Sequence, residues 1–398
     1  MASNTTAFGL VIYIQMAKKK IKINLAKPWF DRREPEAAYR VVKSGYLISG
    51  PLVEKFEREF AKKIGVKYAI AVNSGSSALL VVQQALGIGR GDEVIVPNMT
   101  FISTASSSLY LGARPVFADI EMKTYGIDPE AIVKRIANLP ASRRKKLKAI
   151  IPVHYAGQSC DLDPILKIAR KHKLFVVEDA AEAHLAEYNG RKVGGIGDIG
   201  IFSFTPSKPM TTGEGGMITT NNAELAKKCK LIRNFYDINK FQWHEFGFHF
   251  RMPETMGAIG LVQLAKLERA VAMRMSIAHR YTKELNKLGC IVTPYERTRK
   301  DINFQLYTIM LIPGALSIDR DKFIDELGLR GVQARLYYPC LHKQNVFKGM
   351  GRYNDNEFPN SIAFEKNALS LPIYPGLKNK EVNYVISSIQ EIVKKYKT

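Results

Sequence analysis

Two residues of this sequence, a lysine and an aspartate, have surroundings suited to chemistry on a carbonyl compound. Lys208 follows the apolar run Ile199–Phe204, which predicts a buried strand, and precedes a second predicted strand at Met217–Thr220. A lysine fixed at a strand end can act as an amine nucleophile and form a Schiff base. Asp179 ends the apolar run 174–179 and therefore lies at the carboxyl end of a predicted parallel strand, where open α/β sheets hold their ligands.

Each of these residues also has an ordinary explanation. A lysine in a turn is usually a solvated surface group, and an aspartate at a strand end often caps the following helix. Together, however, Asp179 and Lys208 are the pair that pyridoxal 5'-phosphate (PLP) requires. The lysine binds the aldehyde of the cofactor, and the aspartate keeps the pyridine nitrogen protonated so that the ring accepts electrons.

The sequence around this pair resembles the DegT/StrS-type sugar aminotransferases, a family of fold-type I PLP enzymes. The resemblance rests on Asp179 and Lys208, on the glycine-rich stretch 194–200 and on the tail Thr211–Met217, and it extends from about Pro28 to the C-terminus. The tail most resembles the branch of the family that forms perosamine by aminating a nucleotide-linked keto-deoxy sugar. An enzyme of this kind is therefore expected.

The resemblance implies aminotransfer from an amino acid, with L-glutamate as the expected donor, to a nucleotide-linked keto-6-deoxy sugar of polysaccharide or glycan biosynthesis. PLP would be the cofactor and pyridoxamine phosphate (PMP) its aminated form. Dehydratases of this fold replace the lysine by histidine, whereas this chain keeps Lys208, which favours aminotransfer. Two alternatives stay open: another PLP reaction, such as sugar dehydration or amino-acid cleavage, and a non-enzymatic regulator that retains the fold.

The resemblance also implies further site residues. We expect a turn at 73–77, followed by a helix at Ala78–Leu86. The small hydroxyl residues and the glycine of this turn suit a phosphate, because free N–H groups and the dipole at the start of a helix favour an anion. The same residues are ordinary helix caps. Glu182 stands where many relatives have glutamine, and Leu185 where they usually have glycine. The implied set comprises Gly75, Ser76, Ser77 and Ser203 for the phosphate, Phe101 stacked on the ring, Asp179, Glu182 and Lys208 around it, Asn234 from a second subunit, and Arg335, Tyr338 and His342 on the substrate side.

The composition points away from nucleic-acid and membrane functions. The chain has 59 Lys and Arg against 37 Asp and Glu, a net charge of +22, but these charges are scattered and no nucleic-acid-binding motif is present. We therefore expect the charge to attract phosphate-bearing substrates. No apolar run approaches the roughly 20 residues that span a bilayer. The four cysteines lack the spacing of a metal site, so no metal and a reduced, cytoplasmic protein are expected.

Alternating strand and helix patterns up to Asn221 predict an α/β fold with a mostly parallel sheet between helices, seven-stranded in fold-type I enzymes. We expect a poorly ordered N-terminal extension over 1–27, a large PLP-binding domain over 28–268 and a small C-terminal α+β domain over 269–398. The helical pattern predicts separate helices at Glu254–Glu268 and Arg269–Leu288, and Val332–Tyr338 is expected as a strand. The role implied for Asn234 predicts a homodimer with the cofactor site at its interface.

Overall fold

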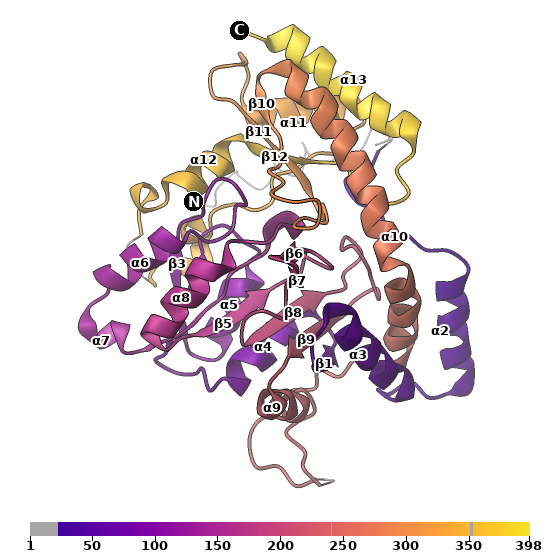
Figure 1. Cartoon of the computed structure of the whole chain (residues 1–398), viewed down its shortest axis with the longest axis vertical. Coiled ribbons are helices and arrows are strands. Elements are labelled where there is room, and N and C mark those ends of the chain that lie inside the picture. The colour runs from indigo at the N-terminus through magenta and orange to yellow at the C-terminus, as the bar shows by residue number, and fades with distance from the viewer. Residues whose placement is uncertain (1–22, 240, 351–352) are drawn as a thin grey trace, which may run out of the picture.

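The structure, a computed structural model, describes residues 23–239, 241–350 and 353–398, so most of the predicted N-terminal extension lies outside the described residues. A seven-stranded sheet in the order β1-β9-β8-β5-β4-β2-β3 forms its centre (Figure 1). Pairing is parallel from β8 through β3, and β9 is antiparallel to both β8 and β1. The predicted mostly parallel sheet is confirmed. Its strands are β1 (Tyr68–Val72), β2 (Glu93–Pro97), β3 (Arg114–Ala118), β4 (Leu147–Ile150), β5 (Phe175–Asp179), β8 (Ile199–Ser203) and β9 (Gly216–Thr220).

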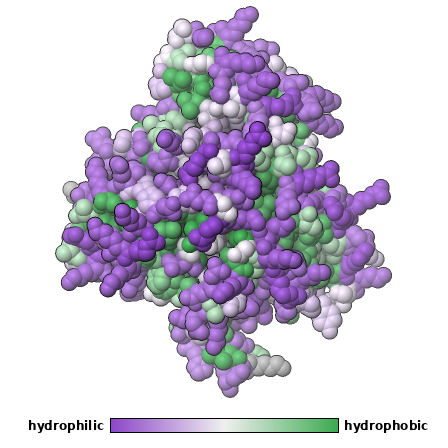
Figure 2. All heavy atoms as spheres, viewed as in Figure 1, coloured by the Kyte–Doolittle hydropathy of each residue, from purple (hydrophilic) through white to green (hydrophobic). Residues whose placement is uncertain are grey.

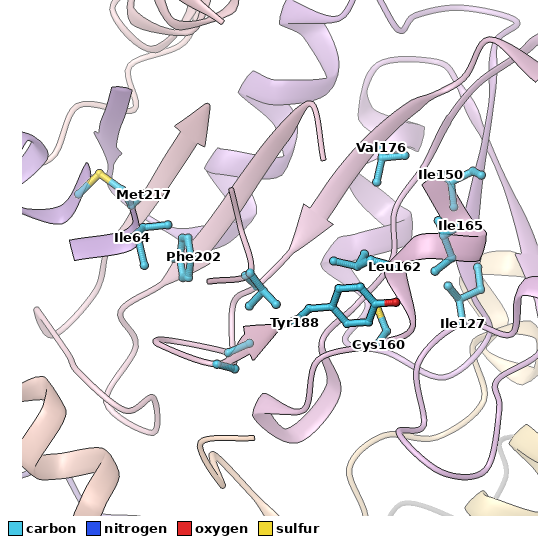
Figure 3. Packing of buried hydrophobic residues seen from close by; sticks show 14 of the residues in the cluster. Ile64, Ile127, Ile150, Cys160, Leu162, Ile165, Val176, Tyr188, Phe202 and Met217 are labelled. Atoms are coloured by element: carbon cyan, nitrogen blue, oxygen red, sulfur yellow. The ribbon is translucent and has the colours of Figure 1, made fainter. Parts of the chain in front are cut away.

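Helices cover both faces of this sheet because its strands are apolar on both sides. In β1, Ala69 and Ala71 face a core shared with α3, α6, α8 and α10, part of which Figure 3 shows. Ile70 and Val72 face the opposite core, shared with α4, α5 and α9. The helices are α2 (Arg33–Ser44), α3 (Pro51–Ile64), α4 (Gly75–Ala85), α5 (Ser103–Tyr110), α6 (Pro129–Asn138), α7 (Ala141–Arg144), α8 (Leu162–His172), α9 (Ala223–Arg233), α10 (Glu254–Leu285), α11 (Arg320–Leu329), α12 (Pro359–Asn367) and α13 (Asn379–Tyr396).

A smaller antiparallel sheet of β10 (Ile291–Val292), β11 (Tyr307–Leu311) and β12 (Ala368–Leu371) has its own core, to which α11 and α13 contribute. A short hairpin, β6 (Glu187–Tyr188) and β7 (Arg191–Lys192), lies between β5 and β8 in the sequence. The division into domains at residues 268 and 269 falls inside α10 and stays a prediction. Among the described helices, none is both long enough and apolar enough to cross a bilayer.

The predicted break between two helices near residue 268 was wrong, since α10 is one continuous helix of 32 residues. Residues 261–285 contain neither glycine nor proline, so nothing in this stretch interrupts the helical hydrogen bonds. The amino-terminal part of α10 packs on α2 and α3, and its other end reaches α13 (Figure 1). A single helix thus connects the two sheets.

The strand expected at Val332–Tyr338 was also wrong. Val332 and Arg335 form only isolated bridges, with Ile23 and Ser370 respectively. Beyond Arg335 the chain leaves the edge of β12, and the Tyr338 hydroxyl donates a hydrogen bond to Glu182, which follows β5. The segment is therefore a connection that brings aromatic side chains to the cavity described below.

Replacing Lys173 by glycine is expected to stabilise the protein by about 0.5–1 kcal/mol. Lys173 ends α8 in the left-handed conformation (φ 55°), which costs an L-residue about 1–2 kcal/mol. Glycine avoids this cost, but its unfolded state has more conformational freedom, so only part of the cost is recovered as stability. Lys171, also exposed but inside α8, is the matched control, because glycine there should destabilise by about 1 kcal/mol. Thermal unfolding midpoints of the two variants should move in opposite directions.

Candidate active site

Lys208 lies on the turn that joins β8 to β9. Two backbone hydrogen bonds close the base of this turn, from the Phe204 N–H to the Gly215 carbonyl (2.9 Å) and from the Thr212 N–H to the Phe204 carbonyl (3.0 Å). A Cβ at Gly215 would collide with the Thr212 hydroxyl, so this closure requires glycine. The closed turn holds the Lys208 side chain, which is 11% exposed, beside the carboxyl end of β8.

Asp179 is the last residue of β5 and is buried, with 5% of its surface exposed. The Thr104 hydroxyl donates to its Oδ2 (2.8 Å), and the Ala181 N–H donates to its Oδ1 (3.2 Å). Burial raises the pKa of the Asp179 carboxyl, whereas the hydrogen bond from Thr104 lowers it. These donors fix the orientation of the carboxylate and favour its ionised form against the effect of burial.

A cavity of about 350 Å³ opens where β5 and β8 end, at the edge of the sheet where α/β proteins place their ligands. Phe101 lies in its wall with 53% of its surface exposed, and its ring centre is 5.7 Å from that of Tyr338. Most residues of the predicted set line this cavity, although distant parts of the chain supply them: Gly75, Ser76, Phe101, Asp179, Glu182, Ser203, Lys208 and Tyr338.

Ser77 and Asn234 do not line the cavity of their own chain. The Ser77 hydroxyl, in the first turn of α4, donates to Oδ1 of Asn73 (2.6 Å), which precedes the helix. Asn234 follows α9 and lies in a separate cleft beside Arg233 and Arg251. The role predicted for Asn234 requires a second subunit and stays a prediction.

Arg335 and His342 also lie outside the lining of the cavity. Arg335 is exposed, with its guanidinium 6.0 Å from the centre of the Tyr337 ring. His342 is held by its two ring nitrogens, each 3.0 Å from an oxygen, one of Asn98 and one of Asp355. Tyr338 is the member of the predicted substrate-side set that lines the cavity together with Lys208 and Asp179.

Glu182 connects the lysine to the wall of the cavity. Its Oε1 accepts hydrogen bonds from Lys208 Nζ (2.9 Å) and from the Tyr338 hydroxyl (2.9 Å). Its Oε2 accepts one from the Ala156 N–H (2.8 Å). Asp179 and Glu214 are also in the lining, and Lys208 is the only cation among the described residues that line the cavity. Carboxylates thus outnumber cations in the lining, and the positive charge of Lys208 balances only part of their negative charge.

The end of the cavity nearest α4 suits a phosphate. Helix α4 begins at Gly75, and its N-cap residue, Ser74, accepts a hydrogen bond from the Ser77 N–H (3.0 Å). A Cβ at Gly75 would lie 2.9 Å from Cβ of Ser203, so glycine lets the helix start against β8. The first N–H groups of a helix have no partner within it, and with the nearby Ser76 and Ser203 hydroxyls they favour an anion.

These features together fit PLP. A phosphate can lie at the start of α4, a flat ring against Phe101, a ring nitrogen at the buried carboxylate of Asp179, and an aldehyde at Lys208. Each required chemical group is present, and glycine at position 75 lets the start of α4 lie close to Ser203, so that both can face one phosphate. The residues present therefore match the cofactor that the sequence resemblance implies.

Thr104 is a residue of the site that sequence reasoning missed. Its hydroxyl lies 3.0 Å from that of Thr100, four residues earlier and before the start of α5, and it contacts Asp179, which is 75 positions away in the sequence. The spacing of the two threonines places both hydroxyls on one side of the chain after β2, which is the only signal the sequence contains. Their partner could not be identified without the fold.

Leu185, the departure noted in the sequence, adopts the left-handed conformation with a φ of 66°. A leucine in this conformation costs about 1–2 kcal/mol, which explains why glycine suits the position. Its side chain is partly buried against the core on the α3 face of the sheet, and this packing offsets part of the cost. The substitution is thus accommodated without displacing Glu182 from Lys208.

Replacing Thr104 by valine is expected to slow amino-group transfer about tenfold, the effect of one hydrogen bond to a charged group. Because Thr104 lowers the pKa of Asp179, its loss raises that pKa, and the acid limb of the pH–rate profile should move to higher pH. Pre-steady-state absorbance with L-glutamate across the pH range measures this shift. The Thr104→Ser variant keeps the hydroxyl and should retain the original profile; an unchanged profile for valine would contradict the role of Thr104.

Comparison with known proteins places the chain among aminotransferases. Residues 29–390 match the DegT/DnrJ/EryC1/StrS aminotransferase family. GDP-perosamine synthase of Caulobacter vibrioides is 38% identical, over 94% of this chain and 98% of that protein. Spore coat polysaccharide biosynthesis protein SpsC of Bacillus subtilis is 35% identical, over 92% of this chain and 96% of that protein. Spr1654 of Streptococcus pneumoniae, solved in its PLP form, superposes with a TM-score of 0.86 at 26% identity, over 94% of this chain and 99% of that chain.

Proposed function

This chain belongs to the DegT/DnrJ/EryC1/StrS family of aminotransferases, and on that premise we propose that it moves an amino group from L-glutamate to the keto group of a nucleotide-linked 6-deoxy sugar. The observation that carries the proposal is a single cavity holding Lys208, a nucleophilic amine, and Asp179, a buried carboxylate. Similarity to a GDP-perosamine synthase supports a nucleotide sugar as acceptor, and similarity to SpsC supports a product used in polysaccharide synthesis.

We propose PLP as the cofactor and PMP as the second form that the same residues hold. When bound, PLP supplies an aldehyde and an electron-accepting ring for amino-group transfer. Lys208 would bind the aldehyde, and Asp179 would face the ring nitrogen and keep it protonated. The start of α4 at Gly75 and the hydroxyls of Ser76 and Ser203 would hold the phosphate.

The remaining residues of the cavity position substrates and protons. Lys208 Nζ acts as the base that takes a proton from the donor's α-carbon and as the acid that returns it. The Phe101 and Tyr338 rings, 5.7 Å apart, form an apolar wall that limits the access of water to this amine. We assign Tyr338 to the substrate side because its hydroxyl reaches Glu182, beside Lys208, and we keep Arg335 and His342 as outer candidates.

We propose a homodimer in which Asn234 reaches the cofactor phosphate of the second subunit. The segment after α9 exposes large apolar side chains, among them Phe241, Trp243 and Phe246, the last with 93% of its surface exposed. Apolar residues gather at the lower tip of the molecule in Figure 2, where Figure 1 shows this segment. Burying such a surface against a second copy would remove it from water.

All four cysteines are buried and unpaired, which supports a reducing compartment, and we propose the cytoplasm.

The visible absorbance of the purified protein with PLP, before and after L-glutamate, tests this function. We expect a cofactor band that L-glutamate converts to that of PMP, with formation of 2-oxoglutarate, and that a nucleotide keto-sugar restores. A protein that binds no PLP would contradict the enzyme function and favour a regulator. A sugar that loses water without gaining nitrogen would instead show a dehydratase.

A further inference from the structure

We propose that Glu182 is the proton acceptor of Lys208: it takes up the proton that the lysine loses when its amine binds the cofactor, and it returns this proton when the amine is released. The inference rests on the proposed function, because it concerns the same lysine and the same cofactor. Glutamine could not replace this carboxyl group contact for contact, because its amide nitrogen cannot accept the hydrogen bond that Oε2 accepts from the Ala156 N–H.

The contact between the two residues is direct and shielded from water. Lys208 Nζ lies 2.9 Å from Glu182 Oε1, and the side chains are 11% and 6% exposed. The other carboxylate oxygen is held by the Ala156 N–H at 2.8 Å, so Oε1 stays turned toward the lysine. A proton leaving Nζ therefore meets Oε1 before it meets solvent.

Attachment of the cofactor removes the charge that Glu182 depends on. The ammonium group of Lys208 is the only cation among the described residues of the cavity, and Asp179 adds a second buried carboxylate close to Glu182. Once the lysine nitrogen is bound in a neutral C=N bond, an ionised Glu182 would be a buried anion that has lost the ammonium group in contact with it. Such a group becomes neutral by taking up a proton.

The other titratable groups that face this pair cannot accept the proton. Burial raises the pKa values of Tyr155 and Tyr338 well above their usual range, so both hydroxyls are already protonated. Burial together with Lys208 lowers the pKa of His184 to about 3, so its neutral form persists. Asp179 is engaged by Thr104 and serves the ring nitrogen. Glu214 also lines the cavity but is exposed, whereas Glu182 is buried and accepts a hydrogen bond from Lys208, so Glu182 is the base placed to take the proton.

The step balances without any further reactant. An ammonium group and an aldehyde give a C=N bond, one water and one proton: two hydrogens of the ammonium leave with the aldehyde oxygen as water, and the third leaves as the proton. That proton converts the Glu182 carboxylate to a carboxylic acid, which can donate to the Tyr338 oxygen now 2.9 Å away. In the reverse direction water adds, the amine is freed, and Glu182 returns the proton to it.

Counting protons tests this inference directly. The cofactor-free protein is titrated with PLP in a calorimeter, at one pH and in two buffers of different ionisation enthalpy, which yields the protons exchanged per PLP bound. We expect the Glu182→Gln variant to release about one proton more per PLP than the wild type, because glutamine cannot hold it. In a Lys208→Ala background the same substitution should change the count by about zero, since no ammonium proton is lost.

Infrared difference spectra provide a second measurement that needs no variant. Loading the wild type with PLP should produce a new carbonyl band of a protonated carboxylic acid. Equal proton counts for wild type and Glu182→Gln, or no new carboxylic acid band, would overturn the role of Glu182. A wild type that binds no PLP would contradict the proposed function itself, so the two failures are distinguishable.

Discussion

Replacing Lys208 by alanine is expected to reduce amino-group transfer by at least about 1,000-fold while the protein remains folded. The amine is lost both as the nucleophile that binds the cofactor and as the base that moves the proton, and acid–base catalysis alone contributes about 10²–10⁴-fold. Lys208 lies at the edge of the cavity on a turn closed by backbone hydrogen bonds, so its removal leaves the strands β8 and β9 intact. Stopped-flow absorbance with PLP and L-glutamate measures the loss.

Two further variants separate the functions of the lysine. Lys208→Arg keeps a positive charge for Glu182 but offers no amine that attacks an aldehyde at neutral pH, so we expect it to be as inactive as alanine. Lys227, exposed on α9, is the control for a general effect of removing a lysine, and its alanine variant should be fully active. Substantial transfer by Lys208→Ala would refute the assignment.

Replacing Asp179 by asparagine is expected to slow the same half-reaction on the order of 100-fold, the range observed when one preorganised electrostatic group is removed from an active site. Asparagine has nearly the same shape and can still accept the hydrogen bond from Thr104. The difference in rate between the wild type and this variant therefore measures the effect of the negative charge. Without that charge the ring nitrogen of the cofactor no longer retains its proton. Rapid-mixing kinetics with L-glutamate gives the rate, and the unfolding midpoint checks the fold.

A graded series strengthens this test. Thr104→Val perturbs the Asp179 carboxylate and should cost about tenfold, less than the loss of its charge. If Asp179→Asn were as fast as the wild type at every pH, the carboxylate would have no role at the ring nitrogen. If its rate fell only because the protein unfolded, the melting midpoint would fall with it.

The positions of Lys208 and Asp179 could be predicted because strand ends can be recognised locally. Asp179 is the charged residue that ends the apolar run of β5, and Lys208 lies in the polar turn after β8, so both lie at the edge where these parallel strands end. The start of α4 was harder to place: the expected turn at 73–77 already contains the helix from Gly75 onward, because Ser74 caps it. Hydroxyl residues favour caps and turns alike, so the pattern does not separate the two.

Contacts between distant segments could not be predicted from the sequence. Thr104 meets Asp179, and Tyr338 meets Glu182 across 156 positions, because the packing of separate elements brings them together. The continuity of α10 was missed for a different reason: the helical pattern was divided after Glu268, at the expected domain boundary, although a helix continues wherever no glycine, proline or cap stops it. Residue types and local patterns therefore predicted most of the residues that line the cavity, whereas the contacts that support these residues could be identified only from the fold.

The continuous helix α10 has a consequence for how substrates enter. One end of this helix packs against α2 and α3, and the other end packs against α13, so a continuous helix rather than a flexible loop connects the two sheets (Figure 1). Swinging one sheet toward the other would bend a helix that lacks glycine and proline over residues 261–285. We therefore expect any opening of the cavity to involve the segments at its rim rather than a movement of one sheet against the other.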